Sequence, residues 1–407
     1  MESHGYKSMK NRLDVNRRDF LKIGGALGIG LLLGNPAAWA QEKKSPVRPP
    51  RPGTSVEEAM KIPKTRHSLP GPFPGRVVEV HNPAAMMNDK PVDGAVSEMF
   101  KSGLERLTQK SLKKSFGMFF DKGDVVGIKV NPVGAGLIST RHEVVSATID
   151  WLTANGLKRE NIVIWDRFDF MLKEAGFVPE RYPGIDIVGL QTMSEDVDEK
   201  GTPNEKSDAT WLDKNGNHIS AGNFDLNVYY WADVEGPKDR AYLNQHVFNG
   251  KYSYFGKLLT QRLTKIINIP VFKNTGNGIS MATKNLGYGA ICNTNRLHNP
   301  LFFDVCTEVL AFPVIRDKLV LNVTDGLRGQ YNGGPEPAAE FVYPLSTLFF
   351  ATDPFALDTI CQRLMVEKRK SMQVKVNEHP MFTEYLRYGQ RLGLGIADPD
   401  KIEHVRI

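Results

Sequence analysis

The sequence G-D-V-V-G-I-K-V-N-P at Gly123–Pro132 is an apolar run that ends in polar residues. Apolar spacing then predicts a helix over 141–155, which Gly156 is suited to end. Asn161–Arg167 follows as a second run of the same kind, apolar until Asp166. Strands buried on both faces of a sheet have this composition. The unit predicts a right-handed strand–helix–strand crossover, and therefore an α/β fold with a mostly parallel sheet.

Further segments extend this sheet on both sides. Helical spacing is predicted over 92–108, and a helix is predicted to start at Asp353, where Pro354 occupies the first helical position. From about residue 191 to 260 the chain is polar and then aromatic, which predicts an inserted, partly β lobe beside the sheet. The other predicted strands lie at 76–80, 185–189, 266–269, 317–327 and 347–351.

The chain has 407 residues and a formal charge of +6, with six Lys/Arg and three Asp/Glu in the first 40 residues. Half of the excess charge thus lies in that short segment, and no basic stretch is interleaved with aromatic residues, so no nucleic-acid partner is expected. The three cysteines form no C-x-x-C motif. This argues against a disulfide framework and against a ferredoxin-type iron–sulfur motif.

The N-terminus resembles an export signal. Asn16–Lys22 (N-R-R-D-F-L-K) is similar to the twin-arginine motif, a short apolar run follows, and Ala38–Ala40 offers a small-x-small cleavage site. We expect a signal peptide over 1–40, the twin-arginine translocase as a partner and a periplasmic location; the alternative is a retained N-terminal anchor. This route carries folded proteins, often with a cofactor inserted, so a metal or another cofactor becomes more plausible. No stable membrane span is expected in the mature chain.

A proline-rich segment from 41 to 75 is predicted to be an extended tether without structure of its own, followed by one α/β domain over 76–407. Within that domain, the stretch 265–290 carries the polar residues of greatest interest. A strand there is stopped by Pro270, and a glycine-rich loop with Lys273 and Asn274 is predicted to expose backbone N–H groups. Ser280 or Thr283 is expected to cap a short helix that carries Lys284 and Asn285.

This stretch predicts an anion-binding site formed by lysines, amides and backbone N–H groups. It is not a phosphate-binding P-loop, because no G-K-[ST] follows the glycines. The alternative is a turn that only connects two elements.

Polar residues recur where the predicted strands end, which is where open α/β sheets bind ligands. The candidate catalytic residues are Asp166, Lys284 and Asp325, and the candidate metal ligands are Asp166, Asp325 and Asp358. The candidate ligand-binding residues are Lys129, Asn131, Lys273, Asn274 and Asn285. Two alternatives stay open: Lys129 snorkels to solvent from the strand end, and Asp166 forms a salt bridge with Arg167 or caps a loop.

Five motifs occur in order: G-D-V-V-G-I-K-V-N at 123–131, K-N-L-G at 284–287, T-D-G-L at 324–327, G-G-P at 333–335 and D-P-F-A-L-D at 353–358. Together they resemble the family known as domain of unknown function 362, over roughly 77–407. The resemblance implies an α/β fold and little about chemistry. Some members carry a ferredoxin-like segment with a C-x-x-C-x-x-C motif, which this chain lacks. The start of the domain is also similar to lactate racemase-like proteins, at the level of fold.

Two functions therefore compete. The first is an exported enzyme that binds a small anionic ligand, with or without a divalent metal. The second is a non-catalytic periplasmic factor for the maturation of a cofactor or a redox protein. Motifs for a serine hydrolase, a zincin or a dinucleotide-binding enzyme are absent from the sequence. The substrate and the reaction are not specified by these patterns.

Overall fold

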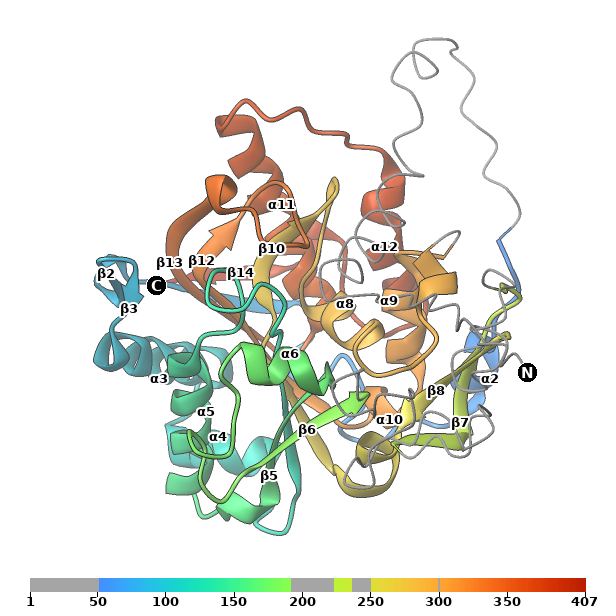
Figure 1. Cartoon of the computed structure of the whole chain (residues 1–407), viewed down its shortest axis with the longest axis horizontal. Helices are drawn as coiled ribbons and strands as arrows, with labels where there is room; N and C mark the ends of the chain where they lie inside the picture. The colour runs from blue at the N-terminus through green and yellow to red at the C-terminus, as the bar shows by residue number, and fades with distance from the viewer. Residues whose placement is uncertain (1–50, 192–222, 236–249, 299–300) are drawn as a thin grey trace, which may run out of the picture. The chain divides into compact units, whose positions relative to one another are not determined.

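The computed structural model describes residues 51–191, 223–235, 250–298 and 301–407. Its central sheet has the strand order β14-β1-β13-β12-β9-β4-β5-β6 (Figure 1). All neighbours from β12 to β6 pair in parallel, whereas β13 is antiparallel to both β12 and β1. The bounds are β1 Arg76–His81, β4 Val126–Lys129, β5 Ile162–Phe168, β6 Asp186–Gln191, β9 Lys265–Asn268, β12 Leu319–Gln330, β13 Val342–Ala351 and β14 Glu403–Arg406. The predicted α/β class with a mostly parallel sheet is confirmed.

The crossover predicted from the opening motif is present. Strand β4 leads through helix α5 (His142–Ala154) into β5, and β4 pairs with β5 in parallel, with Val126 opposite Ile162. Gly156, just after the helix, has a φ of 96°. A residue with a Cβ rarely adopts this angle, which explains why the helix ends at a glycine.

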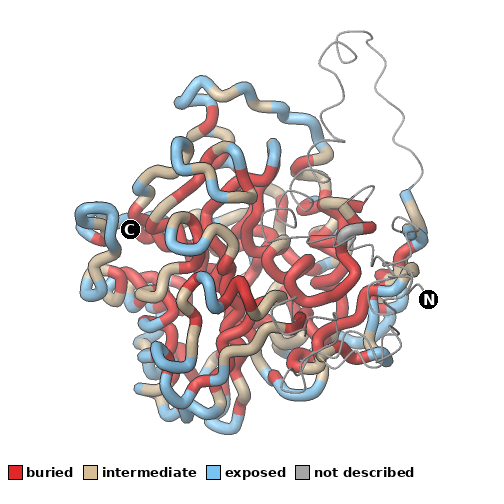
Figure 2. The backbone as a smooth tube through the Cα atoms, viewed as in Figure 1, coloured by how far each residue is buried: buried red, intermediate tan, exposed pale blue. Residues whose placement is uncertain are grey.

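Helices cover both faces of the sheet. On one face α3 (Asp93–Thr108), α4 (Leu112–Phe119) and α5 pack on alternate strand residues such as Ile128 and Ile164. On the other face α8 (Ala282–Gly287), α9 (Asp304–Glu308) and α10 (Pro313–Arg316) pack on residues such as Trp165 and Ile266, and α11 (Pro354–Ser371) packs on Phe349. Successive strand residues point to opposite faces, and both faces are covered here, so the central strands β4, β9 and β12 are almost entirely buried (Figure 2).

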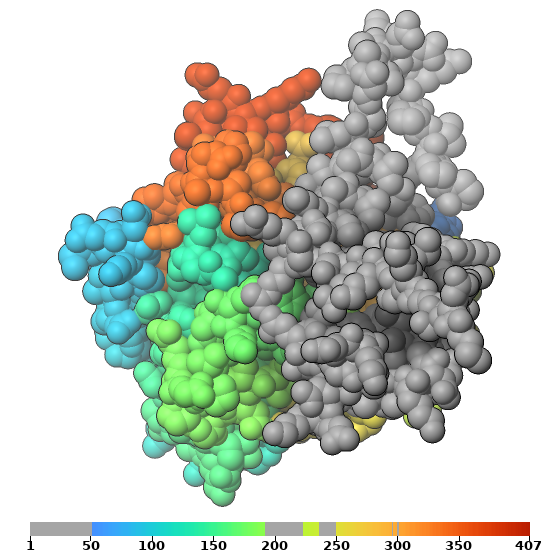
Figure 3. Space-filling view, in the orientation of Figure 1, coloured from blue at the N-terminus to red at the C-terminus, as the bar shows by residue number. Residues whose placement is uncertain are grey.

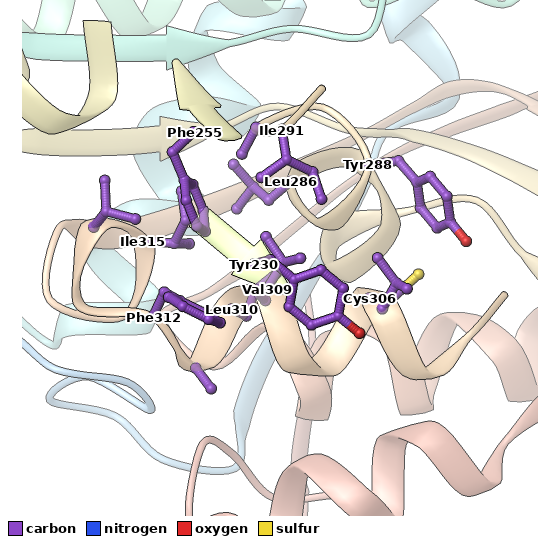
Figure 4. Close-up of a cluster of buried hydrophobic side chains, with 14 of the residues drawn as sticks. Tyr230, Phe255, Leu286, Tyr288, Ile291, Cys306, Val309, Leu310, Phe312 and Ile315 are labelled. Carbon is purple, nitrogen blue, oxygen red and sulfur yellow. The ribbon is translucent and has the colours of Figure 1, made fainter. Parts of the chain in front are cut away.

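The described part of the inserted lobe is a hairpin of β7 (Phe224–Trp231) and β8 (Tyr252–Gly256), which confirms its partly β character. Tyr230 and Phe255 from this hairpin join Leu286 of α8 and Phe312 in one apolar cluster (Figure 4). The lobe is thereby packed against the helix that carries Lys284. Residues 192–222 and 236–249 of the predicted lobe lie outside the described residues.

The N-terminal segment of the described chain differs from the expected tether. Residues 51–75 include helix α2 (Val56–Lys61), of which Val56 and Ala59 are buried. The guanidinium of Arg316, itself buried, donates to the carbonyls of Ile62 at 3.1 Å and Pro63 at 3.0 Å, beyond the C-terminus of α2. Apolar residues between the prolines thus dock this segment on the domain. The predicted signal peptide and cleavage site lie outside the described residues.

The remaining elements are short. They are β2 Met86–Met87, β3 Lys90–Pro91, α6 Asp169–Glu174, β10 Val271–Thr275, β11 Gly278–Ile279, α12 Glu384–Arg391, a π-helical turn at Leu258–Arg262 and 3-10 turns at 83–85, 159–161, 295–298, 309–311, 339–341, 380–382 and 399–401. Figure 3 shows one face of the molecule, which includes residues of the green 112–190 segment and of the orange and red C-terminal third. Within the described residues, no helix combines the length and the apolar character needed to cross a bilayer.

Candidate functional site

Three polar residues lie in one row across the central strands. Lys129 of β4 is opposite Asn268 of β9, and Asn268 is opposite Asn322 of β12. In parallel strands, residues at the same register point to the same face. Here that face is covered by α8, because Asn268 donates to the carbonyl of Ala282 at 3.1 Å. The sheet therefore carries a buried polar row directly beneath the helix with the K-N-L-G motif.

Lys129 is fully paired within this row. It is 1% exposed, and its ammonium donates to the carbonyl of Val130 at 2.8 Å, to Asn285 Oδ1 at 3.0 Å and to the carboxylate of Asp166. Burial lowers the pKa of Lys129, and the neighbouring Asp166 acts in the opposite direction. Since an ammonium has three protons, none remains for a ligand. The snorkelling alternative for Lys129 is therefore wrong, and Asp166 is paired with Lys129.

Asn285 of α8 connects the row to the second lysine. Its Oδ1 accepts from Lys129 and, at 3.3 Å, from Asn131, while its Nδ2 donates to Asn268 Oδ1 at 2.8 Å. Because a lysine can only donate, the oxygen of the Asn285 amide must face Lys129. The Asn285 nitrogen then faces Asn268, which fixes the amide orientation of Asn268 and in turn its contact with Asn322. Asn131 and Asn285 thus serve as rigid supports of the site.

Lys273 is the least compensated of the fully buried charges in this region. It is 0% exposed, and its ammonium donates to two neutral oxygens, Asn131 Oδ1 at 3.1 Å and the carbonyl of Val133 at 3.2 Å. Burial lowers the pKa of Lys273 to about 7, while the charge of Glu336 acts in the opposite direction and that of Lys284 adds to the lowering. Burying a charge without a hydrogen-bonded counter-ion is costly, so the amine is easily deprotonated.

Lys284 is partly exposed and differs from both other lysines. Within the described part of the chain its ammonium makes no hydrogen bond or ion pair; it lies 5.5 Å from the ring centre of Tyr288 and 5.6 Å from that of Phe302. Burial is the main cause that lowers the pKa of Lys284. A cation against two aromatic faces is partly compensated, but it has no anionic partner there.

The expected glycine-rich loop is in fact a β-hairpin. Lys273 and Asn274 lie in strand β10, which pairs with β11 and with β12. Backbone groups that were expected to bind an anion are engaged within the protein: the amide of Gly276, for example, donates to the carbonyl of Gly334 at 3.3 Å. That prediction is wrong, because the apolar residues before Lys273 continue the strand beyond Pro270.

Asn274 anchors the loop that carries Gly334 and Glu336. Its Oδ1 accepts from the amide of Gly334 at 3.0 Å, and a Cβ on Gly334 would lie 2.2 Å from the Asn274 carbonyl oxygen. Gln330, opposite Lys273 in the sheet, donates to the carbonyl of Glu336 at 2.7 Å. These contacts explain the G-G-P motif, and they place Glu336 near the two lysines.

Glu336 is the residue of this site that the sequence reasoning missed. It is half-buried, burial raises its pKa, and the charges of Lys273 and Lys284 oppose that rise. Its carboxylate makes no hydrogen bond within the described ranges. The signal in the sequence was a single acid next to the G-G-P motif.

Asp358 has a structural role. Its carboxylate accepts from the amides of Ala282 and Thr283, both at 2.9 Å, and from the hydroxyl of Thr283 at 2.6 Å. It therefore caps helix α8, which neither Ser280 nor Thr283 does. Burial raises the pKa of Asp358 to about 6.

Asp325 is also engaged by backbone groups. Its carboxylate accepts from the amide of Arg141 at 2.7 Å and from that of Leu327 at 3.0 Å, and burial raises its pKa to about 6. Asp166, Asp325 and Asp358 thus have three separate sets of partners. Over the described ranges, no group of three or more His, Cys, Asp or Glu side chains is arranged to hold a metal ion. The predicted metal cluster of these aspartates is not formed.

Comparison with known proteins gives one match, which covers part of the chain. The profile of the family described as domain of unknown function (DUF362) matches residues 233–363. That range includes Lys273, Lys284 and Glu336, whereas Lys129 and Asp166 lie before it. No curated protein matches the chain.

Proposed function

We propose that the protein binds a small anionic ligand, a carboxylate or a phosphate, between Lys273 and Lys284 at the carboxyl ends of the parallel strands. The observation that carries this proposal is the contrast with Lys129. Lys129 has a carboxylate on its ammonium, whereas the ammonium groups of Lys273 and Lys284 have none within the described residues. A bound anion would supply the missing counter-charge and offset the cost of desolvation.

The contacts of the site favour the binding and orientation of such a ligand over metal chemistry. Asp358 and Asp325 are occupied by backbone amides and Asp166 by Lys129, so we propose no metal ligation by these three residues. The two lysines differ in exposure: Lys284 is partly exposed, and Lys273 is fully buried in the polar network. We therefore propose that the protein is an exported enzyme that acts on a small anion.

The binding proposal is tested by calorimetry on the mature protein at pH 7 with phosphate, malonate and pyruvate as probes. Lys273→Met and Lys284→Met should each weaken binding by at least tenfold, because a charge-assisted hydrogen bond contributes about 1.5–3 kcal/mol. Lys101→Met, which removes an exposed lysine on α3, is the matched control and should bind as the wild type does. If no probe binds, or if binding survives both substitutions at the site, the proposal is wrong.

We also propose that the protein is exported to the periplasm by the twin-arginine translocase. The support is the N-R-R-D-F-L-K sequence at Asn16–Lys22 together with the small residues Ala38 and Ala40. Replacing Arg17 and Arg18 together by lysine keeps the charge and should leave the full-length precursor in the cytoplasm, as measured by cell fractionation and immunoblotting. Unchanged periplasmic recovery of the double variant would contradict this route.

A further inference from the structure

We propose that Lys284 is a nucleophile that forms an imine with a carbonyl group of the bound anion, so that the ligand class is a 2-oxo acid or another anionic aldehyde or ketone. This inference rests on the proposed anion site and adds to it a covalent step. It assigns the two lysines different tasks: Lys273 holds the negative charge, and Lys284 reacts.

The hydrogen-bond partners of the three lysines separate these tasks. The ammonium of Lys129 has three acceptors, one of them a carboxylate, and that of Lys273 has two neutral acceptors. That of Lys284 has none within the described residues. Acceptors stabilise the protonated amine and occupy its nitrogen, so the lone pair of Lys284, which has no acceptors there, is free to attack once the amine is neutral.

The surroundings of Lys284 favour the neutral amine further. Its nitrogen lies against the rings of Tyr288 and Phe302, which exclude water from one side, and these rings are held together because the Tyr288 hydroxyl donates to the Phe302 carbonyl at 2.8 Å. Desolvation is a known means by which a lysine is activated as a nucleophile.

The backbone of Lys284 is fixed more firmly than that of a surface lysine. Asp358 binds the two amides just before it, and Asn285, just after it, is bonded to Lys129 and Asn268. Gly287 packs so closely that an added Cβ would lie 2.7 Å from the Cα of Cys306. Figure 4 shows Leu286 of the same helix within the apolar cluster and Tyr288 beside it. A rigid base positions the amine for attack.

The chemistry balances without a metal or a redox partner. The amine nitrogen of Lys284 adds to the carbonyl carbon, and a carbinolamine forms. The carbonyl oxygen then leaves as water with the two protons of the amine, and a C=N bond replaces the C=O bond. Glu336 is the acid that carries protons between nitrogen and oxygen, because it is half-buried, its charge acts on both lysines, and burial raises its pKa.

The test is reductive trapping on the mature protein. Pyruvate and sodium cyanoborohydride are added at pH 7, and the site of modification is mapped by peptide mass spectrometry, with malonate as an anion that has no carbonyl carbon of the required kind. We expect one adduct, on the peptide that contains Lys284. Lys284→Arg keeps the positive charge and should abolish the adduct, while Lys101→Arg should leave it unchanged.

Three outcomes would overturn the imine proposal: no adduct with pyruvate, an adduct spread evenly over exposed lysines, or an adduct that persists in Lys284→Arg. Calorimetry on the same samples separates the two proposals. If pyruvate and malonate bind but nothing is trapped, the anion site stands and the covalent step fails. If no anion binds and nothing is trapped, both proposals fail. Thermal unfolding of Lys284→Arg confirms that the variant is folded before the result is interpreted.

Discussion

Lys273 allows a quantitative test of the charge imbalance in this site. Burial lowers its pKa from 10.5 to about 7 in the folded protein, and in the unfolded chain the amine regains its ordinary value. Between pH 7 and 10.5 the unfolded state therefore binds more protons than the folded state. The free energy of unfolding should rise with pH in this window, by about 1.4 kcal/mol per pH unit for this one group.

The substitution Lys273→Met removes the group while keeping much of its volume. The absolute stability of the variant is a poor indicator, because relief of the buried charge is opposed by the loss of donors to Asn131 and Val133, at about 1.5–3 kcal/mol each. The useful quantity is the slope of the free energy of unfolding against pH. The other buried lysines remain in both proteins, so the difference in slope isolates Lys273.

The assay is urea unfolding at pH 7, 8 and 9, above the range in which the aspartates with a pKa of about 6 titrate. We expect the wild-type slope to exceed that of Lys273→Met by about 1.4 kcal/mol per pH unit, and Lys101→Met, on the exposed face of α3, to match the wild type. Equal slopes for the wild type and Lys273→Met would refute the reasoning, since they would mean that the buried amine keeps its proton.

Three further outcomes follow from the contacts of the site. Glu336→Gln should raise the affinity for malonate roughly 2- to 5-fold in calorimetry, because it removes a competing, partly screened charge, whereas exposed Glu340→Gln should not; a loss of affinity would contradict this. Asp358→Asn should lower the free energy of unfolding by about 1–3 kcal/mol in urea titrations, since an amide nitrogen would face the backbone donors of α8; no change would contradict the capping role. Gly334→Ala should weaken malonate binding, because the added Cβ would displace the loop that carries Glu336. Gly117→Ala, whose Cβ would meet no atom within 4 Å, should bind normally and gain about 0.5–1 kcal/mol of stability. Equal malonate binding by both variants would show that the contact between Asn274 and Gly334 is unimportant for the site.

The sequence predicted the fold where the pattern was local. The burial of three segments could be predicted from their own residues: the apolar run that ends at Lys129, the amphipathic helix α5 and the second apolar run that ends at Asp166. The right-handed crossover rule then predicts how these segments are arranged. The helix beginning at Asp353 was predictable for the same reason, since its cap lies within the segment: Asp353 accepts from two amides of the first turn.

The roles of the polar residues were not predictable, because each depends on a partner far along the chain. Asp358 caps a helix 75 residues earlier, and Lys129 pairs with an acid 37 residues later. An acid at the end of an apolar segment has the same appearance whether it binds a metal, a backbone amide or a lysine. The hairpin at Lys273 was missed for a related reason: Pro270 interrupts one strand, but pairing with β12 starts the next one immediately.

The three lysines show how one polar network can hold both an ion pair and, within the described residues, a lysine that has no hydrogen-bonded counter-ion. Lys129 and Asp166 neutralise each other, and the amides of Asn131 and Asn285 spread that fixed arrangement to Lys273. Lys273 and Lys284 then share one acid, Glu336, which is half-buried and not hydrogen-bonded within the described chain. Two amines and one acid are balanced in charge only when one amine is neutral and has a free lone pair. An anion that pairs with the buried amine of Lys273 raises the pKa of that amine, which takes up a proton from Lys284 or from water. The neutral amine of Lys284 is then left to react, so binding and nucleophilic activation are consequences of the same missing charge.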